Sequence, residues 1–407
     1  MSEAKIKCEI CGEEVHSIPS HLKAAHHEES ASPMTLAEYR SNYPEAPIIS
    51  EYAERLSREA RERKAKEAEG SVEPETASVA TGHADVSRVN FHEAFRFGKS
   101  MKSAFTKAGA PIPVSRDNRS DEYDYLVPEW SENYILNPEL TKTVIMGLEL
   151  RSPIFLYGHS GVGKSSIFKQ ICAGTNRRLF RFQHTVDTEE SHIVGQWVVK
   201  KHIDVHGNAI SVTEFELGPL PLAMMNGWVY LADEIDRSSP TVLSAYQAIL
   251  KGEPLVIKNA PPSMRMIKPH PLFTFAATGN TNGTGDQSGL YQATLVQDAA
   301  TIERFGIVAM VDYPPEKQEI AMISAATGLH PDEAKKIRKF ADEIRTKAFP
   351  TNVSLTLGPR VAINMARIGM MKGDFVEGVT YAYANRLPEG ERQAAIGIAK
   401  RIFSGAA

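Results

Sequence analysis

The segment at residues 158–165, Gly-His-Ser-Gly-Val-Gly-Lys-Ser, constrains the fold of this chain more than any other. It follows an apolar, aromatic run at residues 154–157 with the composition of a short buried strand, and a helix-forming stretch at residues 166–172 follows it. A strand, a glycine-rich loop and a helix in this order are typical of a phosphate-binding loop. The alternative is a glycine-rich turn with an incidental lysine. The flanking elements favour the phosphate site, and with it an α/β fold in which helices cover both faces of a parallel sheet.

The residues of this loop have the properties that a bound triphosphate requires. Gly158, Gly161 and Gly163 allow the backbone to turn so that successive N–H groups point inward, and the next helix adds partial positive charge at its N-terminus. The Lys164 ammonium group is expected to reach the β- and γ-phosphates, and the Ser165 hydroxyl to hold Mg²⁺. The sequence therefore predicts that ATP and Mg²⁺ are bound by Gly158, His159, Ser160, Gly161, Val162, Gly163, Lys164, Ser165, Ser166 and Asp233.

Two adjacent carboxylates end a second apolar run, at residues 228–234. A further strand is expected at residues 179–182, between the apolar run at residues 154–157 and this second one. In an enzyme with a phosphate-binding loop, Asp233 would position Mg²⁺ through water and Glu234 would polarise the attacking water. The alternative is the acidic start of a helix after a buried strand. Their position downstream of the loop favours the catalytic interpretation.

A third buried strand is expected at residues 272–277 and leads to Asn280. Polar side chains at the carboxyl ends of strands face the nucleotide in open parallel sheets. The Asn280 amide could therefore bind the γ-phosphate or the attacking water. The alternative is an ordinary turn asparagine.

Taken together, these segments resemble AAA+ ATPases of the MoxR group. Residues 233–240 are similar to the Walker B segment of that group, residues 269–280 to its sensor-1 strand, and residues 215–220 to its helix-2 insert. Residues 285–291 and 305–308 are similar to the AAA+ subunits of aerobic cobaltochelatases, the CobS type. The resemblance implies a P-loop AAA+ core with a C-terminal helical lid.

The resemblance also implies roles for two arginines and a ring. Residues 300–305 are similar to the segment that carries the arginine finger, which places that role on Arg304. Residues 357–360 are similar to the sensor-2 motif, which places that role on Arg360. The alternative for each arginine is a surface salt bridge. By resemblance the chain forms a homo-oligomeric, hexameric ring, because an arginine finger acts on the nucleotide of a neighbouring subunit.

The N-terminal residues carry a metal-type pattern of cysteine and histidine. Cys8, Cys11, His21 and His26 have the spacing of a tetrahedral structural Zn²⁺ site, with His27 as a substitute for His26. The alternative is a chance grouping of polar residues. The spacing resembles the Ros/MucR type of C2H2 zinc finger, which implies a small ββα-like fold and DNA binding.

The charge of this module argues against DNA as its partner. Residues 1–50 contain four lysine and arginine residues against eight acidic ones. Because a phosphate-binding face needs an excess of positive charge, we expect the finger to dock a protein, and nucleic acid is an unlikely partner.

The composition divides the chain into segments. Two inserts, at residues 195–220 and 255–270, are expected to face the pore of the ring. The chain has no apolar run long enough to span a membrane and no signal peptide, so a cytoplasmic location is expected. The predicted segments are a zinc finger module at 1–50, a charged helix at 51–69, a flexible linker at 70–87, an AAA+ core with an N-terminal extension at 88–315 and a helical lid at 316–407.

Three functions remain open at this point. MoxR-type ATPases are paired with partners that carry a von Willebrand A domain, which implies a motor that remodels a protein partner or complex. The likeness to cobaltochelatase subunits implies instead a motor that drives Co²⁺ insertion into a corrin ring with a separate chelatase subunit. A DNA-associated regulator is the third interpretation, and the acidic N-terminus argues against it.

Overall fold

The structure, a computed structural model, describes residues 5–25, 34–44, 46–50, 85–203, 209–286 and 288–403. The chain divides into two compact units, residues 1–81 and 82–407. The predicted charged helix at 51–69 lies outside the described residues, as does the predicted linker at 70–87 up to residue 84. The end of that linker is corrected, because Val86 and Ser87 already pair with a neighbouring strand.

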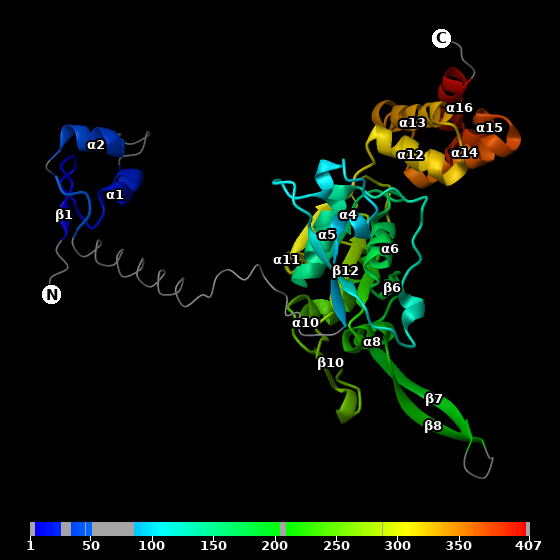
Figure 1. The fold of residues 1–407 in the computed structure, drawn as a ribbon, viewed down its shortest axis with the longest axis horizontal. Coiled ribbons are helices and arrows are strands. Elements are labelled where there is room, and N and C mark those ends of the chain that lie inside the picture. Colours follow the sequence, from blue (N-terminus) through cyan, green and yellow to red (C-terminus); the bar gives the residue numbers. More distant parts are fainter. Residues whose placement is uncertain are drawn as a thin grey trace. The chain divides into compact units, whose positions relative to one another are not determined.

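Unit 1 has the predicted ββα arrangement (Figure 1). Strand β1 (Ile6–Lys7) pairs antiparallel with β2 (Glu14–Val15), and helices α1 (Ile18–Ala25) and α2 (Leu36–Asn42) follow. Helix α2 begins at a capping box, in which the Thr35 side chain and Glu38 each satisfy a backbone N–H of the other. A small core forms from Cys8, Ile18, Leu22 and Tyr39.

Unit 2 contains the predicted parallel sheet. The five strands lie in the order β13-β5-β12-β9-β6, and every neighbouring pair is parallel. The strand at residues 154–157 has the predicted ends, the other three predicted strands are present with shifted ends, and β13 is an additional strand that the sequence analysis did not predict. The strands are β5 (Ile154–Tyr157), β6 (Leu179–Gln183), β9 (Val229–Asp233), β12 (Thr274–Gly279) and β13 (Ile307–Met310).

Alternate side chains of the sheet enter two separate cores, as expected for a sheet covered on both faces. Phe155 and Tyr230 pack into one cluster, whereas Ile154 and Leu231 pack into the other. The helices of this α/β part are α5 (Pro138–Leu150), α6 (Lys164–Thr175), α7 (Glu190–Val194), α8 (Pro219–Asn226), α9 (Pro240–Leu243), α10 (Gln247–Leu250) and α11 (Ala299–Glu303).

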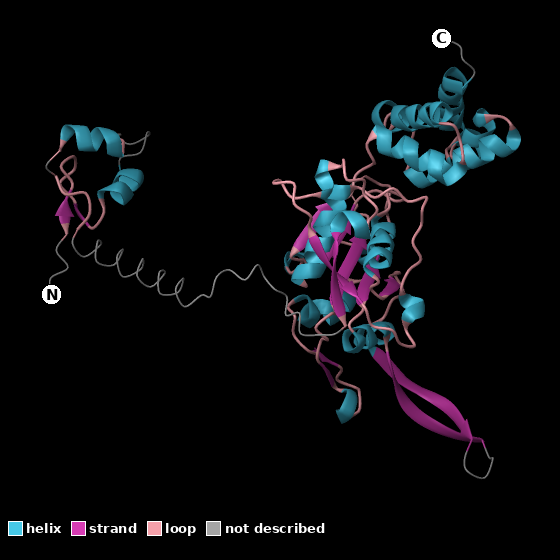
Figure 2. Cartoon of the chain, viewed as in Figure 1, coloured by secondary structure: helices cyan, strands magenta, loops and turns pink. Residues whose placement is uncertain are grey.

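The two predicted inserts are hairpins. Strands β7 (Gly195–Ile203) and β8 (Ala209–Leu217) form a long antiparallel hairpin that extends away from the sheet (Figure 2). A smaller hairpin pairs β10 (Leu255–Val256) with β11 (Met266–Ile267). The Trp197 indole N–H donates to the Asn259 carbonyl oxygen at 2.9 Å, so the two inserts are in contact. That they face a pore stays a prediction.

The C-terminal part is helical, as predicted, and has its own core. The Arg338 and Arg345 guanidinium groups bind the fully buried Glu319 carboxylate, each at 2.7 Å. None of the helices in the described residues combines the length and apolar composition needed to cross a bilayer. The helices are α12 (Glu316–Thr327), α13 (Pro331–Glu343) with a π-helical extension (Ile344–Ala348), α14 (Pro359–Lys372), α15 (Phe375–Ala382) and α16 (Glu389–Phe403).

An N-terminal extension packs on the α/β core of unit 2. Strand β3 (Val86–Asn90) pairs antiparallel with β4 (Pro113–Asp117), and the short helix α4 (Phe91–Ala94) lies between them in sequence. Phe91 and Phe95 lie in the same hydrophobic cluster as α5 and α6 side chains such as Val144 and Phe168.

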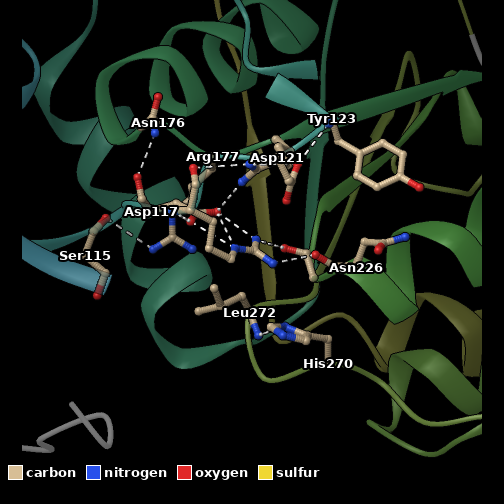
Figure 3. Close-up of polar contacts among 12 residues, drawn as sticks. Ser115, Asp117, Asp121, Tyr123, Asn176, Arg177, Asn226, His270 and Leu272 are labelled. Carbon is tan, nitrogen blue, oxygen red and sulfur yellow. Dashed lines mark hydrogen bonds and ion pairs between the residues drawn. The ribbon is translucent and has the colours of Figure 1, made fainter. Parts of the chain in front are cut away.

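Buried ion pairs fix this extension to the core (Figure 3). The Asp117 carboxylate of β4 binds Arg119 at 2.7 Å and the fully buried Arg178 at 3.3 Å. Arg178 also binds Asp124 at 2.7 Å, and Arg119 donates to the carbonyl oxygen of Asn226 at 2.7 Å. The extension is thereby held to the residue before β6 and to the end of α8.

Replacing Arg178 with methionine should lower the free energy of unfolding of unit 2 by roughly 3–5 kcal/mol, because the Asp117 charge stays buried with one partner fewer. Asp124 is half exposed and should add little. Thermal unfolding measures the effect. The matched control is Arg116→Met, an exposed residue of β4 for which the described residues provide no ion pair. Equal destabilisation by both changes would contradict the prediction.

Candidate nucleotide-binding site

The glycine-rich loop lies between β5 and α6, and two of its glycines are required by close contacts. Gly158 has φ 145°, and a Cβ atom there would lie 2.2 Å from the Val311 carbonyl oxygen. Gly163 has φ 101°, and a Cβ atom there would lie 2.9 Å from the Tyr134 hydroxyl. Both conformations are left-handed and strained for residues with a side chain. The loop can therefore turn tightly at the N-terminus of α6.

Lys164 is a buried ammonium group without a direct ion pair among the described residues. Its Nζ donates to the carbonyl oxygens of Gly158 at 2.7 Å and His159 at 2.9 Å, and to Asn280 Oδ1 at 3.2 Å. Burial lowers the pKa of Lys164 to about 8, although the charge of Asp236 opposes this shift. The structure thus brings Lys164 and Asn280 together, and leaves a cation whose charge a phosphate can neutralise.

Asp233, at the end of β9, connects three elements. Its Oδ1 accepts from the Ser165 hydroxyl at 2.5 Å and from the Thr278 hydroxyl of β12. Its Oδ2 accepts from Arg181 Nε of β6 at 2.6 Å. Burial alone would raise the pKa of Asp233, but these donors hold it below its ordinary value. The hydroxyl and the carboxylate side by side form the pair of hard oxygen ligands that Mg²⁺ prefers.

Glu234 follows the strand in a left-handed turn with φ 54°. The sequence analysis placed Glu234 in the strand, and this prediction was wrong. Its backbone N–H donates to the Thr278 hydroxyl at 3.1 Å. Its carboxylate binds the Gln183 side-chain amide and the Arg237 guanidinium, each at 3.2 Å. A non-glycine residue in this conformation is held there by its surroundings. Glu234 thereby lies at the carboxyl end of β9 and lines the same cavity as Asp233.

These side chains share a cavity of about 250 Å³. Most of the predicted residues line it, and Arg360 reaches it from the second residue of α14. Gly358, just before that helix, comes so close to the loop that a Cβ atom would lie 2.6 Å from the Ser160 carbonyl oxygen. The lining residues are Ser160, Gly161, Gly163, Lys164, Ser165, Ser166, Lys169, Arg181, Gln183, Asp233, Glu234, Thr278, Asn280 and Arg360.

Other predicted residues do not line this cavity. His159 stacks on Tyr313 with ring centroids 5.3 Å apart, and burial lowers its pKa. Val162 lines a neighbouring cavity of about 410 Å³, together with Tyr134, Ile135 and Met322. Arg304 is half-buried at the end of α11 and donates to the Ala300 carbonyl oxygen of its own helix at 2.6 Å.

Sequence reasoning missed four polar residues of the cavity: Lys169, Arg181, Gln183 and Thr278. Three of them lie in the last residues of β6 and β12, and Asn280 was predicted from the same kind of position at the carboxyl end of a strand. The same rule for strand ends, applied to β6 and β12, would have indicated Gln183 and Thr278. Lys169 lies in α6 without a sequence signal of its own.

Three of the four predicted metal ligands lie together in unit 1. One ligand atom each from Cys8, Cys11 and His21 lies within 4.8 Å of the others. Cys11 Sγ is 3.1 Å from His21 Nε2, and His21 Nδ1 lies 3.8 Å from a Glu13 carboxylate oxygen. Two thiolates and an imidazole oriented by a carboxylate fit Zn²⁺. His26 lies outside the described residues.

Comparison with known proteins agrees with this geometry. Residues 153–297 match the model of the AAA domain, dynein-related subfamily. The aerobic cobaltochelatase subunit CobS of Sinorhizobium sp is 29% identical over 276 residues, which cover 66% of this chain and 80% of that protein. The gas vesicle ATPase GvpN of Ancylobacter aquaticus is 23% identical over 311 residues, which cover 71% of this chain and 84% of that protein.

Two further similarities are weaker. The first covers a small part of the relative, and the second has a low sequence identity and a low TM-score. Midasin of Dictyostelium discoideum is 25% identical over 217 residues, or 52% of this chain and 3% of midasin. The structure of the Thermotoga maritima RuvB Holliday junction branch migration motor covers 67% of this chain and 73% of RuvB, with 16% identity and a TM-score of 0.36. The AAA domain and the ATPase relatives show that this chain is an ATPase of the AAA type, related to CobS and GvpN.

We predict that ATP binding weakens above about pH 8. The Lys164 ammonium has a pKa of about 8 without nucleotide, and a bound phosphate raises it, so the affinity gained from its charge is lost as the pH rises through that value. The dissociation constant of a fluorescent ATP analogue should increase about tenfold from about pH 7 to about pH 9. The Lys169→Gln variant, which alters an exposed lysine of the same cavity, should keep this dependence. An affinity independent of pH would contradict the assignment.

Proposed function

We propose that this chain is the subunit of an ATP-driven ring motor that remodels a protein partner or complex. The observation that carries the proposal is the cavity lined from two sides, by the strand ends of the sheet and by Arg360 of the helical part. A nucleotide held there contacts both parts of unit 2. Binding and hydrolysis can then change how the lid packs on the loop, which is the movement that a motor requires.

Each residue of the cavity has a separate role in ATP binding and hydrolysis. Lys164 and the loop N–H groups bind the phosphates, while Ser165 and Asp233 hold Mg²⁺, which supplies charge neutralisation when bound. The Glu234 carboxylate accepts a proton from the attacking water, and Asn280 orients that water or the γ-phosphate. The adjacent cavity, with Ile135 and Met322 in its lining, suits the base of ATP.

The position of the Arg304 side chain supports the proposal that the chain forms an oligomer. Its side chain does not line the cavity of its own subunit, and its guanidinium group binds the carbonyl oxygen of Ala300. An arginine that serves hydrolysis from outside its own site acts on the nucleotide of a neighbouring copy. We therefore propose a homo-oligomeric ring, hexameric by resemblance, and a partner that carries a von Willebrand A domain. The cytoplasmic location expected from the sequence remains a prediction.

Unit 1 is proposed to be a structural zinc module that docks a protein. Cys8, Cys11 and His21 supply three ligands, and His26 is proposed as the fourth. Four protein ligands leave no open position for catalysis on the metal. Glu9, Glu13 and Glu14 lie around the cysteine pair and favour a basic protein surface over DNA.

A second candidate is the motor of a cobaltochelatase. It is favoured by the similarity to CobS, which extends over 80% of that protein. In that case the ring would act with a separate chelatase subunit on Co²⁺ insertion into a corrin.

Replacing Cys8 with serine should reduce bound zinc from one ion per chain to almost none, because serine is a poor zinc ligand. The ATPase rate should stay unchanged, since Cys8 lies in unit 1 and the nucleotide cavity in unit 2. Metal analysis of the purified protein and a phosphate-release assay measure the two effects. The control is Cys172→Ala, which alters the buried cysteine of α6 and should keep its zinc. Full zinc content in the Cys8 variant would refute the ligand set.

The Glu234→Gln variant should bind ATP and hydrolyse it at least about 100-fold more slowly, because the attacking water loses its base. Affinity capture of this variant in ATP, followed by mass spectrometry, then tests the function. Recovery of a von Willebrand A protein without a chelatase subunit supports remodelling, and recovery of both supports the cobaltochelatase motor.

The matched control for the capture is Glu253→Gln, which alters an exposed glutamate after α10 and should hydrolyse ATP normally. Capture of neither kind of partner by the Glu234 variant, beyond what the control retains, would contradict both functions.

A further inference from the structure

Asp236 is a buried carboxylate that has no role in the mechanism above. It lies three residues beyond Asp233, in a short 3₁₀ turn, and its residue is fully buried. Its Oδ2 accepts from the backbone N–H of Asn280 at 2.8 Å, and from the N–H and hydroxyl of Thr281 at 2.9 and 3.1 Å. One carboxylate oxygen therefore holds the whole turn that follows β12.

The backbone of Asp236 binds a second segment. Its carbonyl oxygen accepts from the Leu295 N–H at 2.8 Å and from the Gln297 side-chain amide at 3.3 Å. That amide also donates to the Ser238 carbonyl oxygen at 3.0 Å, and the Gln297 backbone N–H donates to the Gly283 carbonyl oxygen at 2.8 Å. Gln297 is only 6% exposed, so these bonds form away from water.

The second segment leads directly to Arg304. Asp298, next to Gln297, caps α11 by accepting from the Ala300 N–H at 3.2 Å, and Arg304 follows the last residue of that helix. The residue Asp236 is thus bonded both to the turn of Asn280 and to the start of the segment that carries Arg304.

We propose that Asp236 is a positioning residue for ATP hydrolysis. Its side chain fixes Asn280 in the nucleotide site of the same subunit, and its backbone fixes, through Gln297, the segment that carries Arg304 toward the site of the neighbouring subunit. The inference rests on the roles proposed above for Asn280 and Arg304. A buried carboxylate is costly unless donors bind it, and here three donors of the Asn280–Thr281 turn bind one of its oxygens.

The position of these groups matters because hydrolysis depends on small distances. A displacement of about 1 Å in a group that orients the water or the phosphate can lower the rate about 100-fold while binding is kept. Asp236 does not line the nucleotide cavity, so its loss should affect orientation more than affinity.

The test compares two variants of Asp236 in the full chain. Asp236→Ala removes the acceptor and should lower kcat about 100-fold, while the dissociation constant for a fluorescent ATP analogue changes less than about threefold. Asp236→Asn keeps an acceptor for the Asn280 and Thr281 N–H groups and should restore kcat to within about tenfold of the unchanged protein. A kcat for Asp236→Ala within about threefold of the unchanged protein would overturn the proposal, as would equal rates for the two variants.

The comparison with Asn280 separates this inference from the roles on which it rests. Asn280→Ala should itself lower kcat, and the double variant Asp236→Ala, Asn280→Ala should be no slower than the slower single variant, because both act on one group. A normal rate for Asn280→Ala alone would remove the proposed role of Asn280. A slow Asn280 variant with a normal Asp236→Ala variant would remove only the positioning role. The control is Asp374→Asn, which caps α15 through the Val376 N–H at 2.7 Å and should leave kcat unchanged.

A second variant tests the link to Arg304 and does not depend on the folding of Asp236→Ala. Gln297→Met keeps the size of the side chain but removes its donors, and should lower kcat about tenfold at unchanged ATP affinity. Mixed with the Lys164→Ala protein, whose Arg304 segment is intact, it should turn over faster than the two proteins do separately. No effect of Gln297→Met on kcat, or no gain on mixing, would overturn the link to Arg304.

Discussion

The buried ammonium group of Lys164 is the interaction on which the rest of the site depends. A buried cation is unfavourable unless polar groups surround it. Here two carbonyl oxygens of the glycine-rich loop and Asn280 Oδ1 accept hydrogen bonds from this ammonium group. The loop can present those carbonyls only because Gly158 takes a left-handed conformation against Val311. The Asn280 oxygen is within reach only because β12 lies directly beside β5 in the sheet. Local backbone geometry and strand order are therefore both conditions for one hydrogen-bonded group.

Much of this could be predicted from the sequence, because the signals are local. The glycine spacing at residues 158–165 and the apolar runs before it and before Asp233 indicate a parallel sheet with a phosphate loop, and the structure has both. The helical nature of the C-terminal part and the positions of the two inserts were also predicted correctly, although the hairpin form of the insert at residues 195–220 was not predicted. The comparisons confirm the ATPase activity, while the roles of single site residues remain proposals.

What the sequence does not reveal are contacts between distant residues. Arg178 and Asp117 are separated by 61 positions and have no motif, yet they fix the N-terminal extension to the core. Arg181 looks like an ordinary charged residue of an edge strand, and only the pairing of β6 with β9 shows that it binds Asp233. The left-handed turn at Glu234 was missed because glutamate has no preference for it, and three-dimensional contacts with Thr278 and Gln183 hold it in place.

The two arginines define how a ring of such subunits could couple its sites. Arg360 lines the cavity of its own subunit from the helical part, so a nucleotide bound there would contact it. Arg304 lies outside that cavity, at the end of a segment bonded to the turn that carries Asn280. A change in the nucleotide at Asn280 would therefore be transmitted through Asp236 and Gln297 to Arg304, the residue that we propose acts on the next site. Coupling of this kind needs a contiguous set of buried contacts that can take two arrangements. The Gln297 amide supplies the buried contact between the two segments, because its acceptors belong to the turn after Asp233 and to the segment before α11.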